Sequence, residues 1–203
     1  MAKDFGSLKL YADKIAKFQQ GKIIRAYADE LGKDDVFVQA LGEGVCAALA
    51  TQWLHSRGVF EKKSAEELVR RAAGAQKKYM DSHDRDVLFK NASIKFDASV
   101  YMTFPGDPDL GTHMESWLRN DERTGTKAAY VNCKIREKEG DRGGGHALAV
   151  KQKSDGLHLF DANVGWYRIR SGVVQQFCDA LEAGYARKGY TFSSPKFVPV
   201  KHV

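Results

Sequence analysis

The sequence predicts an α+β fold, in which helices come first along the chain and antiparallel strands follow. Apolar residues recur at helical spacing up to about residue 80, whereas short apolar or alternating runs, separated by glycine-rich or polar turns, fill most of the last third. The length of 203 residues fits one domain with its own hydrophobic core. We therefore expect a single domain, with an N-terminal helical segment over residues 1–34 packed on a core over residues 35–203.

The expected helices rest on periodicity and on start signals. Leu8, Ile15 and Tyr27 belong to an apolar series at three- and four-residue spacing, with Gly21 as a candidate break. Ser64 with Glu67 three residues later is a capping box, which starts a helix. The pattern predicts helices over residues 8–31, 45–54, 64–80, 114–118 and 173–187.

The expected strands lie at residues 128–135, 146–150, 157–161, 166–170 and 190–200. Asp155-Gly156 is a hairpin signal, so the second and third of these strands should pair antiparallel. If paired positions sum to 307, His146 faces Asp161; if they sum to 309, His146 faces Asn163. Because positions 161 and 163 share parity, both registers place an acid or amide on the histidine's face.

Composition excludes several classes of protein. Three cysteines make a disulfide scaffold a poor fit, and no apolar run is long enough to cross a membrane. The N-terminus lacks the apolar stretch of a signal peptide, so we expect synthesis in a reducing cytosol and any export by a signal-peptide-independent route. The net charge of +6 suits nucleic acid, anionic lipid or an acidic partner, but most of it lies in mixed-sign stretches typical of solvated faces.

Cys46 is the first residue that indicates chemistry. It lies in the first turn of the expected buried helix, where unpaired N–H groups and a partial positive charge favour a thiolate. Gly42 and Gly44 leave the approach to the sulfur open. Taken alone, Cys46 fits a small buried residue in an alanine-rich helix better than a nucleophile.

His146 and Asp161 complete a possible relay. His146 opens an apolar strand after three glycines, and Asp161 ends the next strand. A catalytic histidine needs a carboxylate or amide that fixes its tautomer and stabilises its imidazolium. Each residue alone also fits a structural role, but a cysteine at a helix start, a histidine at a strand start and a neighbouring carboxylate together indicate a Cys-His-Asp triad.

Three strings around these residues resemble the motifs of the YopT-type papain-like cysteine proteases, the YopT/AvrPphB effector family. They are Gly44-Val45-Cys46-Ala47-Ala48-Leu49-Ala50-Thr51-Gln52-Trp53-Leu54, Gly145-His146-Ala147-Leu148-Ala149-Val150 and Leu159-Phe160-Asp161-Ala162-Asn163-Val164-Gly165. Ala162 stands where that family usually has proline. The resemblance implies a papain-like core, with a helical half carrying Cys46 packed on an antiparallel sheet carrying His146 and Asp161.

The resemblance further implies a bacterial effector or toxin that needs no cofactor or metal and cleaves a specific host protein. Its oxyanion would be held by the backbone N–H of Cys46 and by a polar side chain, for which Gln39 is the candidate. We expect a monomer that does not bind nucleic acid, with peripheral association with an acidic membrane as an additional possibility. Two alternatives stay open: a papain-like deamidase, transglutaminase or acyltransferase, and a non-enzymatic basic binding module.

Overall fold

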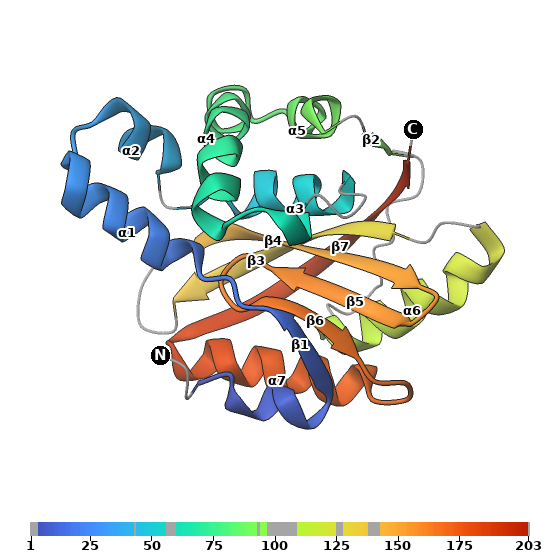
Figure 1. The fold of residues 1–203 in the computed structure, drawn as a ribbon. Coiled ribbons are helices and arrows are strands. Elements are labelled where there is room, and N and C mark those ends of the chain that lie inside the picture. The colour runs from blue at the N-terminus through green and yellow to red at the C-terminus, as the bar shows by residue number, and fades with distance from the viewer. Residues whose placement is uncertain are drawn as a thin grey trace.

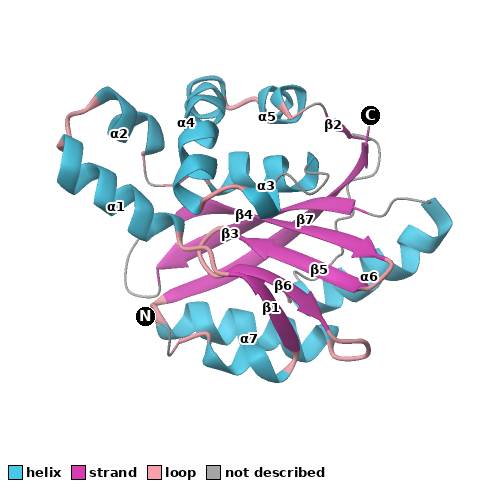
Figure 2. Cartoon of the chain, viewed as in Figure 1, coloured by secondary structure: helices cyan, strands magenta, loops and turns pink. Residues whose placement is uncertain are grey.

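The computed structural model describes residues 4–42, 44–55, 60–92, 94–96, 109–124, 128–137 and 143–202. In these residues a seven-stranded antiparallel sheet carries helices on both faces (Figure 2). The strands are β1 Ala12–Ala16, β2 Ile94–Phe96, β3 Ala128–Glu137, β4 Gly143–Lys153, β5 Gly156–Asp161, β6 Gly165–Ile169 and β7 Tyr190–His202, in the spatial order β1-β6-β5-β4-β3-β7-β2. The helices are α1 Gln20–Leu31, α2 Val36–Leu41, α3 Cys46–His55, α4 Ala65–Ser82, α5 Arg85–Asn91, α6 Leu110–Thr124 and α7 Val174–Arg187, with the 3-10 turns η1 Gly6–Leu10 and η2 Phe60–Lys62.

The sheet separates two hydrophobic cores. Helices α1 to α5 cover one face, and α6, α7 and η1 cover the other (Figure 1). Side chains alternate between the faces: Ala147 and Ala149 of β4 face α3, whereas Leu148 and Val150 lie in the core beneath α6 and α7. Two covered faces explain why residues 147–150 of β4 are all apolar.

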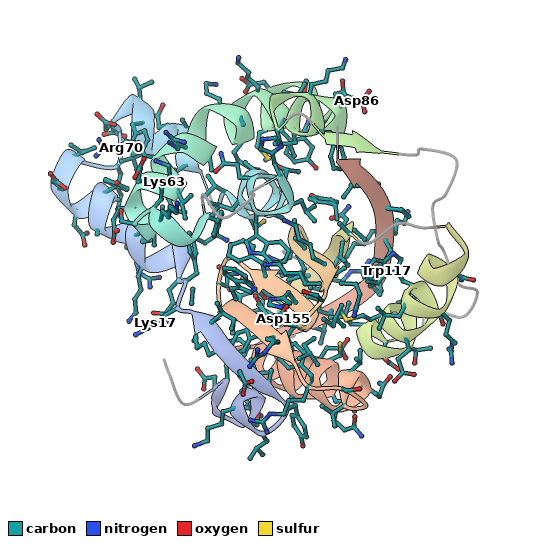
Figure 3. The ribbon with its side chains drawn as sticks, turned by 45° about the vertical axis from the view of Figure 1, so that its right-hand side comes forward. Lys17, Lys63, Arg70, Asp86, Trp117 and Asp155 are labelled. Atoms are coloured by element: carbon teal, nitrogen blue, oxygen red, sulfur yellow. The ribbon has the colours of Figure 1, made fainter. Side chains whose placement is uncertain are left out.

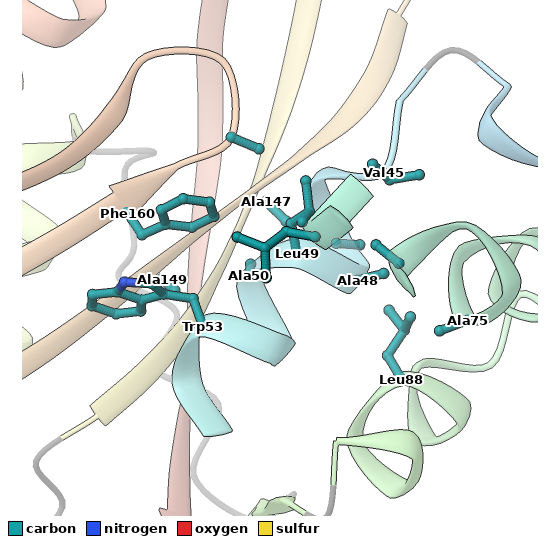
Figure 4. Close-up of a cluster of buried hydrophobic side chains, with 14 of the residues drawn as sticks. Val45, Ala48, Leu49, Ala50, Trp53, Ala75, Leu88, Ala147, Ala149 and Phe160 are labelled. Atoms are coloured by element: carbon teal, nitrogen blue, oxygen red, sulfur yellow. The ribbon is translucent and has the colours of Figure 1, made fainter. Parts of the chain in front are cut away.

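Helix α3 lies in the middle of the first core, directly on β4 (Figure 4). Alanines on both elements let the helix backbone approach the sheet closely. Trp53, near the C-terminal end of α3, stacks on Phe160 with ring centroids 5.8 Å apart. The buried Lys151 donates a hydrogen bond from Nζ to the Trp53 carbonyl oxygen over 2.8 Å. These contacts fix α3 along its length, so its first residue, Cys46, has a defined place above the start of β4.

The second core is also aromatic. Trp117 of α6 stacks on Phe197 of β7, with ring centroids 5.9 Å apart.

Charged side chains such as Lys17 and Arg70 lie on the outside of the molecule (Figure 3). None of the helices in the described ranges has the length and apolar character that crossing a bilayer requires.

Most of the expected elements are confirmed, including the α+β order, the strands of the last third and the capped helix α4, where Ser64 Oγ accepts from the N–H of Glu67 over 3.1 Å. The short helix expected at residues 114–118 is the longer α6. The string Pro105-Gly106-Asp107-Pro108-Asp109 also predicts a loop; residues 105–108 lie outside the described residues, and Asp109 directly precedes α6.

The single helical stretch expected over residues 8–31 is wrong for Ala12–Ala16, which form β1. Tyr11, Ile15 and Phe18 fit helical spacing locally, but β1 pairs with β6 as the edge strand of the sheet, and this distant pairing decides its conformation. The segment before residue 34 therefore supplies a sheet strand as well as helix α1.

We predict that Gly165→Ala destabilises the protein by about 2 kcal/mol or more, because the new side chain meets both strain and a clash. Gly165 has φ 136°, and a Cβ there would lie 2.5 Å from the backbone oxygen of Ala16 in β1. The measurement is the free energy of unfolding by urea. Gly172→Ala is the matched control: its φ is 75° but the space around it is open, so a loss as large as that of Gly165→Ala would contradict the proposed clash.

Candidate active site

Cys46 is the first residue of α3, and the N–H groups around it are only partly satisfied. The Val45 N–H donates to Gln20 Oε1 over 2.9 Å, and the Ala48 N–H donates to Gln76 Oε1 over 3.1 Å. The N–H of Cys46 has no acceptor among the described residues. A helix start of this kind presents a free donor and a partial positive charge beside the sulfur.

His146 lies near the start of β4, where that strand extends beyond its neighbour. The ladder between β4 and β5 pairs Leu148 with Asp161, which is the register whose positions sum to 309. His146 and Asp161 therefore share a face of the sheet, on the side of α7. Both side chains are buried, with exposed fractions of 2% and 0%.

The imidazole is held by two partners at one ring nitrogen. His146 Nε2 lies 3.2 Å from Asp161 Oδ1 and 3.0 Å from the hydroxyl oxygen of Tyr185 on α7. The Tyr185 hydroxyl donates its proton to Asp161 Oδ2 over 2.8 Å, so its oxygen accepts the other hydrogen bonds. One of these comes from Asn163 Nδ2, at 3.3 Å. Nε2 therefore carries a proton, and Nδ1 is left for Cys46.

Cys46 and His146 form a hydrogen-bonded pair whose charges support each other. Burial raises the pKa of the Cys46 thiol, but the hydrogen bond and the positive charge of His146, with a hydrogen bond from the Ala147 backbone, lower this pKa below its ordinary value. Burial lowers the pKa of His146, but the Asp161 carboxylate and the Cys46 sulfur raise this pKa above its ordinary value. Both shifts favour the thiolate form of Cys46 and the imidazolium form of His146.

The other two cysteines differ sharply from Cys46. Cys133 and Cys178 are fully buried, and burial raises the pKa of each thiol well above its ordinary range. Cys46 is partly exposed. Among the three thiols, only that of Cys46 belongs to a partly exposed residue and has a lowered pKa, and exposure and a lowered pKa are the two properties of a reactive cysteine.

The structure brings Cys46, His146 and Asp161 together and leaves Gln39 apart. Gln39 has an exposed side chain on α2, and in the described part of the chain no contact joins it to the other three residues. The buried amide beside Cys46 is that of Gln20 instead, 26 positions earlier in the chain.

The sequence reasoning gave no role to Gln20 or Tyr185. Gln20 precedes Gly21, the candidate break in the expected helix, and nothing in the local pattern connects it to Cys46. Tyr185 lies on a helix whose apolar face faces the sheet, so its spacing predicts a core residue and says nothing of its hydroxyl.

We predict that the rate at which Cys46 reacts with iodoacetamide has a pH midpoint below the ~8.5 typical of a free cysteine. The thiolate is the reacting form, so the rate is lost only as pH falls through the lowered pKa of Cys46. In His146→Ala, burial remains while the imidazolium is gone, so the midpoint should move above that of a free cysteine. Mass spectrometry locates the label, and the buried Cys133 and Cys178 serve as internal controls. A wild-type midpoint at or above ~8.5 contradicts the ion pair.

We predict that Tyr185→Phe lowers the free energy of unfolding by about 1–3 kcal/mol, because a buried carboxylate oxygen and an amide lose their shared partner. Chemical denaturation measures this loss. Tyr79→Phe on α4 is the control, since the Tyr79 hydroxyl has no hydrogen bond among the residues that the structure describes. Equal stability of the two variants would show that the Tyr185 hydroxyl does not stabilise the site.

Comparison with known proteins identifies the fold. No family model matches the chain, and no curated protein sequence matches it either. Among solved structures, the chain is similar to the crystal structure of the Pseudomonas avirulence protein AvrPphB, with a TM-score of 0.52 and 15% sequence identity over 81% of this chain and 94% of that one. The expected papain-like α+β architecture of the YopT/AvrPphB type is therefore confirmed as the fold of this chain.

Proposed function

We propose that this protein is a cysteine endopeptidase of the bacterial effector type, which cleaves a specific host protein with Cys46, His146 and Asp161. The observation that carries the proposal is the hydrogen-bonded Cys46–His146 pair at a helix start, with Asp161 Oδ1 3.2 Å from the opposite nitrogen of the imidazole. A papain-like fold holding this trio supports the proposal. The net charge of +6 would favour encounter with an acidic or membrane-bound target.

The reaction begins with the thiolate. Cys46 Sγ attacks the carbonyl carbon of the scissile peptide bond, and the carbonyl oxygen becomes an oxyanion that the Cys46 N–H stabilises. The His146 imidazolium gives its Nδ1 proton to the leaving amine as the carbon–nitrogen bond breaks. The product is a thioester on Cys46.

Water then resolves the thioester. The neutral His146 takes a proton from the water as its oxygen attacks the carbonyl carbon, and the carbon–sulfur bond breaks. The acid product leaves, and the thiolate–imidazolium pair is restored. Asp161 stabilises the imidazolium in the resting and final states and, with Tyr185, holds the ring so that Nδ1 faces the sulfur.

The same thioester serves a deamidase, a transglutaminase or an acyltransferase, because these differ only in the bond attacked and in the acceptor. The basic binding module is less well supported, since it gives no role to a buried thiolate–imidazolium pair. As an effector, the protein would be delivered into a host cell, where we propose that it acts as a monomer.

The test is a search for new protein N-termini in eukaryotic cell extract treated with the purified protein. We predict one or a few new N-termini with wild type, none with Cys46→Ala, and a rate lower by about 100-fold or more with Asp161→Asn. Cys178→Ala is the matched control, because that cysteine lies in the second core. Cleavage retained by Cys46→Ala contradicts the proposal, and a deamidated or amine-modified target with an intact backbone favours the alternative acyl chemistry.

A further inference from the structure

Gln20 is a buried polar residue that joins two parts of the site. Its side chain is 4% exposed. Oε1 accepts from the Val45 N–H over 2.9 Å, and Nε2 donates to Asn163 Oδ1 over 3.0 Å. The backbone N–H of Gln20 also donates to the Ala162 carbonyl over 2.8 Å. Residue 20 is therefore bound both to the start of α3 and to the turn that follows Asp161.

These bonds belong to a closed ring that passes through the triad. From Gln20 the path runs to Asn163 and on to the Tyr185 hydroxyl, which donates to Asp161. Asp161 contacts His146, and His146 bonds Cys46, which is the chain neighbour of Val45. The Val45 N–H closes the ring on Gln20. Gln20 is the member that comes from the N-terminal segment, directly after the edge strand β1 and the linker to α1.

This ring of hydrogen bonds requires both an acceptor and a donor from the side chain of residue 20, and the Gln20 amide supplies both. The Val45 N–H needs an acceptor, and Asn163 needs a donor because its own amide N–H groups face Tyr185. The amide meets both needs without placing a negative charge beside the thiolate. Gly44 packs against the same amide, since a Cβ at position 44 would lie 3.4 Å from Gln20 Nε2.

We propose that Gln20 is a positioning residue that holds the first turn of α3 against the Asn163–Tyr185–Asp161 group and thereby keeps the Cys46 sulfur on His146. The proposal rests on the proposed function, and it places part of the catalytic apparatus in the N-terminal segment. The titratable groups that act on the sulfur are His146 of β4, Asp161 of β5, Tyr185 of α7 and Cys133 of β3. Gln20 carries no charge, and it affects the Cys46 sulfur by holding the sulfur and these groups in position relative to one another.

The test compares the pH dependence of Cys46 alkylation in Gln20→Ala, Gln20→Met and Gln19→Ala. Gln19 is the matched control, because it is the same residue type one position earlier and its side chain makes no capping hydrogen bond. Gln20→Ala loses both bonds, so we expect the midpoint to rise and the rate at pH 6.5 to fall by about tenfold, one pKa unit. Gln20→Met fills similar space without a charge and also loses both hydrogen bonds, so its midpoint should also rise.

Thermal unfolding of the same variants separates positioning from folding. Gln20→Met is close to glutamine in length and adds no charge, so it decides the matter if Gln20→Ala does not fold. Raised midpoints in folded Gln20 variants, with Gln19→Ala like wild type, support the proposal. Midpoints of both Gln20 variants equal to that of wild type overturn this inference and leave the proposed function intact, whereas an ordinary thiol midpoint in wild type overturns both.

Discussion

The ion pair between Cys46 and His146 is the interaction on which the rest of the site depends. A thiol and an imidazole placed together in a poorly solvated environment are ordinarily neutral, because burial penalises both charges. Here Asp161, the helix start and the Ala147 backbone compensate for that penalty. The surroundings of Cys46 and His146 thus favour the charged forms of both side chains, at a residue that is only partly buried.

The two-layer packing of helices on the sheet makes this arrangement possible. Helix α3 lies on one face of β4, and α7 covers the other face. Cys46 therefore approaches the start of β4 from one side, while Tyr185 supports His146 and Asp161 from the opposite side. The helices on either face of the sheet supply only part of the site, so the arrangement of the site depends on the packing of both hydrophobic cores.

The triad could be predicted from the sequence because each member lies next to a strong local signal. Cys46 follows two glycines at a helix start, and His146 and Asp161 lie on opposite sides of an Asp-Gly turn whose parity fixes their common face. The exact register could not be predicted, since both registers satisfied that parity. Strand β1 and the role of Gln20 could not be predicted from the sequence, because they depend on strand pairing and hydrogen bonds between residues about 150 positions apart.

The most direct test of the central claim is ¹⁵N NMR of the His146 imidazole across pH in the resting protein. The account predicts that both ring nitrogens carry protons at neutral pH, and that mutation of Cys46 to alanine lowers the pKa of His146 because the thiolate partner is lost. A His146 ring that is neutral at pH 7 in the wild-type protein, and that titrates identically without the cysteine, would contradict the account.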